Sequence, residues 1–398
     1  RDMRFVLNEV FEVSKLWAQL PGLAEVVDEE TAVAILEEAG KVTGGVVAPL
    51  NRSGDEEGCS WDNGVVKTPA GYPEAYRTYA EGGWVGVGGD PEFGGMGMPK
   101  VIGAQVEEMV NSASLSFGLY PMLTSGACLS ILNHASQELK EQYLPNMYAG
   151  TWAGSMCLTE PHAGTDLGII RTKAEPAGDG SYRLKGNKIF ISAGDHPLSE
   201  NIVHMVLAKL PDAPPGVKGI SLFIVPKFLV NDDGSLGERN DVTLAGLFHK
   251  MGWRGTPSTA LNFGDKDNCV GYLVGKPHHG LSYMFQMMNE ARIGVGMGAV
   301  MLGYAGYLYS LNYARERPQG RLPDGKNPSA PQVSIIEHAD VKRMLLAQKA
   351  YVEGAFDLGL YASRLFDDTE TLDTEEERKN ALQLLDLLTP IVKAWPSD

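Results

Sequence analysis

The segment from residue 156 to residue 166, Met-Cys-Leu-Thr-Glu-Pro-His-Ala-Gly-Thr-Asp, has the composition of a polar turn that could hold a ligand. It carries two hydroxyl side chains, Thr159 and Thr165. A turn of this kind exposes backbone N–H groups and hydroxyls, which donate hydrogen bonds to a bound cofactor. Threonine is also a common turn or cap residue, so the pattern alone favours a purely structural role.

A second candidate is the alternating run at residues 188–192, Lys-Ile-Phe-Ile-Ser. Because side chains in a strand alternate between its two faces, we expect Phe190 and Ser192 on the same face. An aromatic ring beside a hydroxyl could stack on a heteroaromatic ring and form a hydrogen bond with it. The alternative is an ordinary phenylalanine of the hydrophobic core, which is the commoner role of this residue in a strand.

The elements that must position these residues follow in the order helices, strands, helices. The first 154 residues have mainly helical spacing, with helices expected at residues 31–47 and 137–148. From about residue 156 the apolar period changes from 3.6 to 2, which predicts strands. The predicted strands are residues 182–184, 188–192, 202–207, 219–226, 259–263 and 270–274, with a polar excursion at residues 230–244. Further helices are predicted at residues 281–315, 334–366 and 374–392, with a loop at residues 315–333.

This order predicts an α+β fold of three domains. They are an N-terminal α-helical domain (residues 1–154), a small central β-barrel-like domain (155–278) and a C-terminal α-helical domain (279–398). We expect the last domain to be incomplete at its C-terminus, and further residues to precede Arg1, since the chain does not begin with Met.

Two glycine-rich stretches leave alternatives open. Residues 82–97 could cradle a phosphate, but they lack a Gly-Lys-Thr/Ser ending, so a plain connection is favoured. In the helix at residues 281–315 each glycine costs roughly 1 kcal/mol relative to alanine. Close packing against another helix, or against a bulky ligand such as CoA, would offset that cost. These glycines are Gly294, Gly296, Gly298, Gly303 and Gly306.

The composition excludes several classes of partner. The net charge of −16, without a cluster of Lys and Arg, argues against binding to nucleic acid. The four cysteines are far apart and the histidines are scattered, so we expect neither a disulfide framework nor a metal site, and a reducing compartment. No run of apolar residues is long enough to predict a transmembrane segment. A cytoplasmic location follows as the expectation.

Several motifs, taken together and in this order, resemble those of the acyl-CoA dehydrogenase family. The first is the Thr-Glu-Pro-His-Ala-Gly-Thr-Asp turn at residues 159–166, and the Lys-Ile-Phe-Ile-Ser run follows it. The others are Lys-Met-Gly-Trp-Arg at 250–254, Asn-Glu-Ala-Arg at 289–292 and Tyr-Ala-Arg-Glu-Arg at 313–317. The resemblance covers essentially the whole chain. Residues 51–59, 210–215 and 226–230 resemble the longer branch of that family, which includes 3-methylmercaptopropionyl-CoA dehydrogenases.

The resemblance implies a site for FAD and for an acyl-CoA. The flavin ring and the FAD phosphates would be held by Met156, Leu158, Thr159, Gly164, Thr165, Phe190, Ile191 and Ser192. Arg317 and Gln319 resemble an arm that reaches the FAD pyrophosphate of a neighbouring subunit. In many members an aromatic residue precedes the glycine after that arm, whereas here Gly320 follows Gln319 directly. Substrate binding is implied for Thr165, Asn289 and Arg292.

The reaction implied by the resemblance removes the α-proton of an acyl-CoA while the β-hydrogen passes to the flavin as hydride, giving a trans-2-enoyl-CoA. A glutamate base is required near the substrate. In some members the base directly precedes the arginine matched by Arg292, but Ala291 occupies that position, and Glu290 is rotated from it by about 100° on a helix. We therefore expect the general-base glutamate beyond Asp398 and no catalytic base within these residues.

Partners follow from the same resemblance. They are the acyl-CoA substrate, an electron-transfer flavoprotein as electron acceptor, and further copies of the chain in a homodimer or homotetramer. Two other functions stay open. One is an acyl-CoA oxidase on the same fold that uses O₂, and the other is a base-lacking scaffold that binds flavin and acyl-CoA without turnover.

Overall fold

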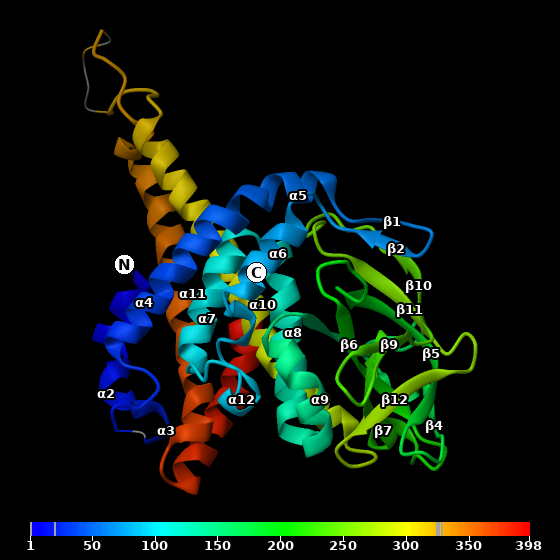
Figure 1. Ribbon diagram of the computed structural model, residues 1–398. Coiled ribbons are helices and arrows are strands. Elements are labelled where there is room, and N and C mark those ends of the chain that lie inside the picture. Colours follow the sequence, from blue (N-terminus) through cyan, green and yellow to red (C-terminus); the bar gives the residue numbers. More distant parts are fainter. Residues whose placement is uncertain (1, 20, 324–326, 328) are drawn as a thin grey trace. The chain divides into compact units, whose positions relative to one another are not determined.

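The computed structural model describes residues 2–19, 21–323, 327 and 329–398, with helices, then strands, then helices (Figure 1). This order confirms the predicted α+β class. The chain forms two compact units. Unit 1 comprises Arg1–Glu29, Lys100–Ser112 and Arg292–Asp398, and unit 2 comprises Glu30–Pro99 and Ala113–Ala291. The three domain boundaries inferred from the sequence stay a prediction.

An eight-stranded sheet forms the centre of unit 2, with the order β10-β11-β5-β12-β7-β6-β3 and with β4 paired to β5 and β6. Its central strands are strongly apolar, and every residue of β7 is buried. Such strands are covered on both faces, so they need not alternate between apolar and polar residues. The strands are β3 (Trp152–Cys157), β4 (Lys173–Pro176), β5 (Tyr182–Ser192), β6 (Asn201–Lys209), β7 (Ile220–Pro226), β10 (Val242–Leu247), β11 (Ser258–Phe263) and β12 (Cys269–Val274).

Helix α8 (Leu115–His134) packs against strand β3 at the edge of this sheet, with α9 (Gln137–Tyr148) beside it (Figure 1). The backbones of α8 and β3 come close at Gly154, where a Cβ atom would lie 2.6 Å from Ala127 Cβ. The Gly154 N–H donates to the Thr124 hydroxyl, 3.0 Å away. The remaining helices that lie mainly in unit 2 are α4 (Glu29–Val42), α5 (Asn51–Glu57) and α6 (Tyr72–Glu81), and a hairpin of β1 (Ser60–Asp62) and β2 (Val65–Lys67) follows α5.

Helix α8 differs from the expectation that no apolar run of the chain is long enough to span a membrane. Within the described part of the chain, α8 alone is long and apolar enough to cross a membrane by length and composition. However, 78% of its apolar window is buried, as in the core helix of a globular protein. Its apolar residues were not recognised as one helix in the sequence, because Gly, Ser and Thr interrupt them.

Several short strands lie where the sequence predicted none. Strands β1 and β2 lie in the predicted helical region, and β4 precedes the first predicted strand. Strand β8 (Phe228–Val230) ends at the first residue of the predicted polar excursion, β9 (Leu236–Arg239) lies within it, and β10 begins within it. These elements are too short to carry a clear period. The two predicted strands at residues 182–184 and 188–192 are one continuous strand, β5.

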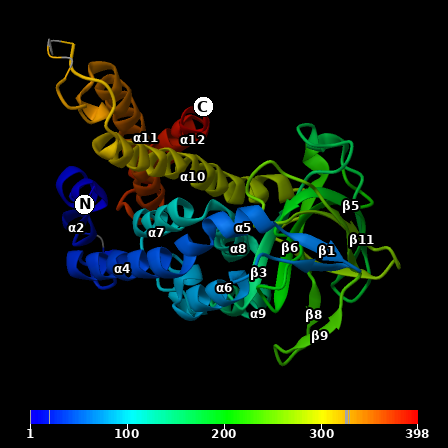
Figure 2. The ribbon, with the colours of Figure 1, turned by 90° about the horizontal axis from the view of Figure 1, so that it is seen from above.

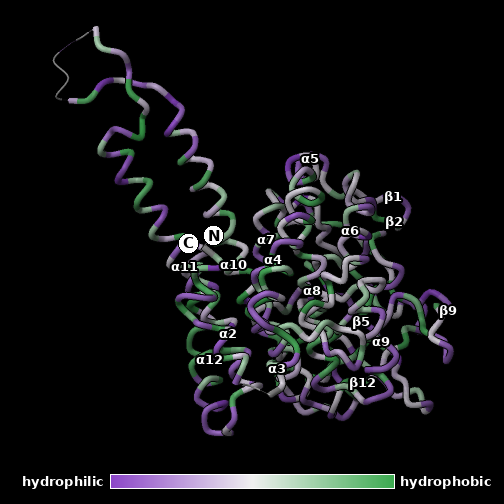
Figure 3. The backbone as a smooth tube through the Cα atoms, turned by 60° about the vertical axis from the view of Figure 1, so that its left-hand side comes forward, coloured by the Kyte–Doolittle hydropathy of each residue, from purple (hydrophilic) through white to green (hydrophobic). Residues whose placement is uncertain are grey.

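Unit 1 is helical. Its long helices are α7 (Lys100–Ala113), the second part of α10 (Gly280–Glu316), α11 (Ala339–Thr371) and α12 (Glu375–Ser397). Helices α10 and α11 run side by side (Figures 1 and 2), with the Tyr304 and Phe356 rings 6.4 Å apart. Hydrophilic and hydrophobic segments alternate along both helices (Figure 3), as expected for helices with one packed face. The short elements α1 (Asp2–Phe5), α2 (Val13–Trp17) and α3 (Pro21–Ala24) also belong to this unit.

The glycines of α10 answer one question left open by the sequence. A Cβ atom on Gly296 would lie 2.1 Å from the Val392 carbonyl oxygen of α12, so close helix packing requires this glycine. At Gly303 a Cβ atom would lie 3.2 Å from Val352 of α11. Helix–helix packing is therefore the role of Gly296. Gly306 is different, because it is exposed and a Cβ atom there would meet nothing within 4 Å beyond its own helix backbone.

Replacing Gly296 and Gly306 by alanine should have opposite effects. We expect Gly296→Ala to lower the free energy of unfolding by about 1–3 kcal/mol, because the new methyl group meets backbone that cannot move aside. Gly306→Ala should raise the free energy of unfolding by about 0.5–1 kcal/mol through helix propensity alone. Urea denaturation of both variants measures the difference. Equal effects in the two variants would contradict the packing role of Gly296.

Candidate functional site

The turn that contains Thr159 begins directly after strand β3 and is closed by its own backbone. Glu160 N–H donates to the Ala163 carbonyl at 2.9 Å, and Ala163 N–H donates to the Glu160 carbonyl at 3.0 Å. The Thr159 carbonyl accepts from the N–H of Ile189 in β5 at 2.9 Å. The structure thus brings the two segments singled out in the sequence together, although about 30 residues separate them along the chain.

The predicted residues of this turn differ in exposure. Met156 and Leu158 are half-buried and pack against the hydrophobic core of unit 2. Thr159 is half-buried, whereas Gly164 and Thr165 are exposed. A Cβ atom on Gly164 would lie 3.7 Å from the Thr159 methyl group, so the two ends of the turn are neighbours. The turn therefore offers two hydroxyls at the surface above an apolar floor.

A β-bulge changes the direction of strand β5 beside this turn. Opposite β11, Lys188 pairs with Leu261 and Ile191 pairs with Thr259, so β5 carries one extra residue between these pairs. Phe190 lies in the bulge with a φ of 59°, which is rare for an aromatic residue. Backbone strain of this kind is concentrated at functional sites.

The side chains after the bulge agree with the predicted alternation. Phe190 is 58% exposed, Ile191 is buried and Ser192 is half-buried. The ring of Phe190 lies 4.5 Å from that of Phe248, which follows strand β10. Ile191 belongs to the core of the sheet, so its side chain does not reach the surface, and its carbonyl accepts from the Thr259 hydroxyl. Any contact of Ile191 with a cofactor would have to come from its backbone.

Two buried charges that the sequence did not single out lie beneath the turn. Lys188 Nζ and Glu160 Oε1 are 2.9 Å apart, and both side chains are almost fully buried. Burial lowers the pKa of Lys188, and Glu160 offsets part of that effect. Burial also raises the pKa of Glu160, but Lys188 and the Thr172 hydroxyl outweigh it and hold this pKa below its usual value. The two side chains thus form a buried ion pair in which each charge offsets the burial of the other.

Asn289 belongs to the part of α10 that packs in unit 2. Met287, two residues before it, is fully buried in the same core that supports Met156 and Leu158. Met288 packs on that core as well. A Cβ atom on Gly126 of α8 would lie 2.9 Å from Met287 Cγ, so the start of α10 is held closely against α8. Asn289 itself is half-buried.

Arg292, Arg317 and Gln319 belong to unit 1. Arg292 is half-buried in α10, while Arg317 and Gln319 are exposed just after this helix ends. Their backbone is held firmly. Gln319 N–H donates to the Val333 carbonyl at 2.9 Å, and the Gln319 carbonyl lies 2.7 Å from His338 Nε2. The two polar side chains thus project from an ordered backbone.

The glycine-rich stretch at residues 82–97 does not present a phosphate cradle. Its N–H groups donate within the stretch, as from Met96 to the Gly86 carbonyl and from Gly97 to the Gly89 carbonyl, both at 2.9 Å. A Cβ atom on Gly95 would lie 2.0 Å from the Gly89 backbone. The glycines allow the segment to fold closely on itself, which supports a plain connection.

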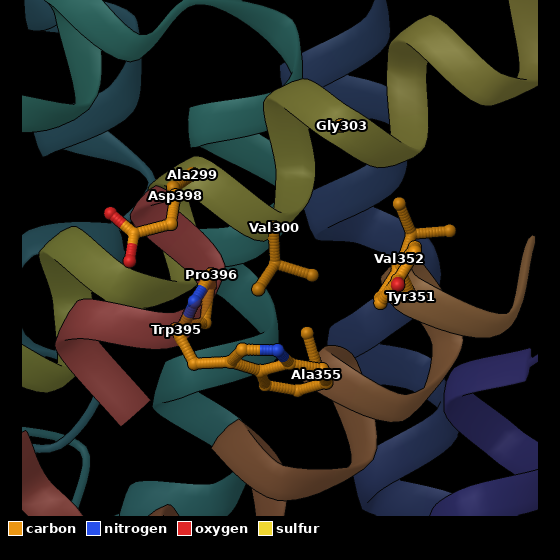
Figure 4. A pocket seen from close by; sticks show the side chains of 9 residues that line it. All are labelled: Ala299, Val300, Gly303, Tyr351, Val352, Ala355, Trp395, Pro396 and Asp398. Atoms are coloured by element: carbon orange, nitrogen blue, oxygen red, sulfur yellow. The ribbon is translucent and has the colours of Figure 1, made fainter. Parts of the chain in front are cut away.

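An apolar pocket of about 330 Å³ lies in unit 1 between α10, α11 and α12 (Figure 4). The Trp395 indole lies beside Ala355, and Val300 faces it from α10. Asp398 is the charged residue of this lining, so the pocket is unsuited to a pyrophosphate. The remaining lining residues are Ala299, Gly303, Tyr351, Val352 and Pro396.

Among the residues that the structure describes, no group of three or more His, Cys, Asp or Glu side chains could hold a metal ion. Cys59, Cys128, Cys157 and Cys269 are free thiols. The chemistry of the turn and of strand β5 is therefore that of hydroxyls, backbone amides and an exposed aromatic ring.

Comparison with known proteins identifies the family of the chain. Residues 29–151 match the N-terminal domain of acyl-CoA dehydrogenases, and residues 155–266 match their middle domain. The chain belongs to the acyl-CoA dehydrogenase family.

The chain is 43% identical to the 3-methylmercaptopropionyl-CoA dehydrogenase of Ruegeria pomeroyi over 99% of its own length and 66% of that protein. It is 40% identical to a butyryl-CoA dehydrogenase of Syntrophomonas wolfei, over all of its own length and 66% of that protein. It therefore spans just under two thirds of these relatives. An acyl-CoA dehydrogenase of Bacillus anthracis, solved in complex with FAD, has the same fold, with a TM-score of 0.72 and 21% identity over 94% of this chain and 59% of that one.

Proposed function

We propose that these residues bind FAD and an acyl-CoA, as part of an enzyme that oxidises the acyl-CoA to a trans-2-enoyl-CoA. The observation that supports this proposal best is the hydrogen bond from Ile189 to Thr159. It joins the Thr159 turn to the bulge of β5, so that Thr159, Phe190 and Ser192 come from two adjoining segments. Hydroxyls beside an exposed aromatic ring suit the polar edge and the flat face of a flavin.

The residues fit FAD in other respects. Met156 and Leu158 pack on the core beneath the turn, and Ile189, two residues before Ile191, joins the turn to β5. Gly164 and Thr165 are exposed and free of bulk, which suits phosphate groups or the pantetheine arm of CoA. When bound, FAD accepts the hydride from the β-carbon. In this proposal the hydroxyls of Thr159 and Ser192 orient the ring, and Phe190 shields it from water.

Binding of a dianion to a chain with a net charge of −16 requires local cations. We propose that Arg317 and Gln319 reach the FAD pyrophosphate of a neighbouring copy, in a homodimer or homotetramer. Their exposed side chains on an ordered backbone support this role. Asn289 and Arg292 would hold the CoA part of the substrate.

The substrate is proposed to be a short acyl-CoA, such as 3-methylmercaptopropionyl-CoA, since the relatives described above are named for that substrate and for butyryl-CoA. The α-proton requires a carboxylate base, and we propose a glutamate outside these 398 residues. Ala291 before Arg292 and the greater length of the relatives support this assignment. An electron-transfer flavoprotein as acceptor and a cytoplasmic location complete the proposal.

Titration of the purified chain with FAD tests the cofactor site. We expect saturable binding, followed by the change in flavin fluorescence, and an increase of about tenfold in the Kd for FAD in Phe190→Ala. Trp61→Ala is the control, because Trp61 is also an exposed aromatic residue of unit 2 but lies in the β1–β2 hairpin. Equal loss of affinity in both variants, or no binding by the unaltered chain, would contradict the proposal.

A dehydrogenase and an oxidase differ in the acceptor that takes the electrons from the reduced flavin. With a short acyl-CoA under air, a dehydrogenase releases little hydrogen peroxide and reduces an added electron acceptor, whereas an oxidase releases peroxide in proportion to turnover.

The location of the general base is tested separately. Full turnover by a protein of these 398 residues alone would show that the base lies within them.

A further inference from the structure

Two buried charges tie the Thr159 turn to strand β5. Lys188 is fully buried and Glu160 is 3% exposed, and the Lys188 ammonium lies 2.9 Å from Glu160 Oε1. An ion pair at such depth is unusual, because removing two charges from water costs several kcal/mol for each ion. The family motifs contain both residues, but the site described above uses neither of them directly.

Lys188 holds the backbone on both sides of Thr159. Its ammonium donates to the Leu158 carbonyl at 2.9 Å and to the Glu160 carboxylate at 2.9 Å. The Thr159 carbonyl is itself bonded to the N–H of Ile189. Three consecutive residues of the turn are thus each joined to β5, which leaves the backbone around the Thr159 hydroxyl little freedom.

Glu160 holds the same turn to the segment that leads into β4. Its carboxylate accepts from the N–H of Arg171 at 2.7 Å and from the N–H of Thr172 at 3.0 Å. The Thr172 hydroxyl donates to it as well, at 2.6 Å. With Lys188 these groups satisfy both carboxylate oxygens. Glu160 therefore connects three segments, namely the turn, β5 and the entry to β4.

We infer that Glu160 and Lys188 are positioning residues for the flavin, which hold the turn at residues 158–165 in the conformation that presents the Thr159 hydroxyl. This inference rests on the proposed FAD site. Apolar residues of similar volume could fill the same space without the cost of removing two charges from water. They could not donate to the Leu158 carbonyl or accept from Arg171 and Thr172. The need for a fixed turn explains why Glu160 and Lys188 are charged, although packing alone does not require charges at these positions.

The test compares FAD affinity with folding stability in the double variant Glu160→Leu/Lys188→Met. We expect its midpoint of urea unfolding to fall, because the N–H groups of Arg171 and Thr172 and the Leu158 carbonyl lose their partners. Where the variant is still fully folded, its Kd for FAD should nevertheless rise by about tenfold or more. Glu160→Gln keeps the shape and one acceptor oxygen, so its Kd should rise by a smaller factor. Hydrogen exchange at the amides of Ala163 and Ile189 should accelerate in both variants, since these amides close the turn.

A matched control lies on the same strand. Lys185 and Asp267 form an ion pair that is exposed, so Lys185→Met should leave the Kd for FAD unchanged. Variants of Glu160 that fold and bind FAD as tightly as the unaltered chain would overturn the inference while leaving the proposed function intact. If the unaltered chain itself fails to bind FAD, the proposed function fails and this inference fails with it. Should the double variant not fold, Glu160→Gln and its exchange rates decide the question in the same way.

Discussion

Replacing Lys188 alone by methionine is expected to lower the free energy of unfolding by about 3–5 kcal/mol, because it leaves a buried carboxylate without its cation. Glu160 would keep its bonds to Arg171 and Thr172, but the nearest positive charge would be gone. The Leu158 carbonyl would also lose the donor that it has in the folded protein. Urea denaturation at neutral pH, followed by circular dichroism, measures the change.

Two further variants show whether the loss of stability in Lys188→Met is caused by the buried, unpaired charge. Lys185→Met removes a lysine from the same strand, but its partner Asp267 is exposed, so its effect on the free energy of unfolding should be small beside that of Lys188→Met. The double variant Glu160→Leu/Lys188→Met should recover part of the stability lost in Lys188→Met, since no unpaired charge remains, although the N–H groups of Arg171 and Thr172 lose their acceptor. A loss below about 1 kcal/mol in Lys188→Met would be inconsistent with an ionised buried pair.

Acidification is expected to destabilise the protein through two buried histidines of unit 2. Burial, with smaller contributions from Lys227 and His204, lowers the pKa of His196 from an ordinary value of 6.5 to about 3. The pKa of His204 is lowered equally far, by burial and then by Lys227 and Arg239. Both rings are therefore neutral in the folded protein. Between pH 6.5 and 3 the unfolded chain binds more protons than the folded one, so stability falls as the pH falls.

The size of this loss of stability follows from the lowered pKa values of His196 and His204. From about pH 7.5 to about pH 5.5 each histidine should contribute a loss of about 1.4 kcal/mol, or about 2.7 kcal/mol for the pair. The measurement is the difference in this loss between the unaltered chain and the double variant His196→Asn/His204→Asn. Burial raises the pKa of Asp367 in unit 1 to about 7, which has the opposite sign, but this contribution is common to both proteins and cancels.

His249→Asn serves as the control for the pH experiment, because His249 is exposed in unit 2. This variant removes a histidine from the surface instead of from the core. An identical dependence in the double variant would mean that the two rings are not held neutral by the fold. The imidazole of His204 has a polar partner, with its Nδ1 atom 2.7 Å from Ser155 Oγ, so its replacement by asparagine preserves a polar group at that point.

The sequence predicted the elements best where a period was sustained. Helix α9 begins and ends at the predicted residues, and α10 extends by one residue at each end. Strand β3 was missed, because it is buried on both faces and its residues Trp152–Cys157 show no alternation. The grouping of α7 with the C-terminal helices was not predictable either, since it depends on contacts between segments far apart in sequence.

The site could be predicted in part for the same kind of reason. Thr159, Phe190 and Ser192 were identified by their residue types, and the structure brings their segments together. Lys188 was missed because strict alternation would put it on the same face as Phe190. Because of the bulge, Lys188 faces inward and Phe190 faces outward. A bulge without glycine has no local sequence pattern from which it could be predicted.

The extra residue in β5 makes the strand unusually sensitive to length. Lys188 and Ile191 both face inward although three positions separate them, which a regular strand does not permit. Removing a single residue at the bulge would restore regular alternation and leave one half of the strand out of phase with its neighbours. Either the buried lysine would turn to solvent or the exposed phenylalanine would enter the core. The number of residues in β5 is therefore more tightly constrained than the identity of its side chains.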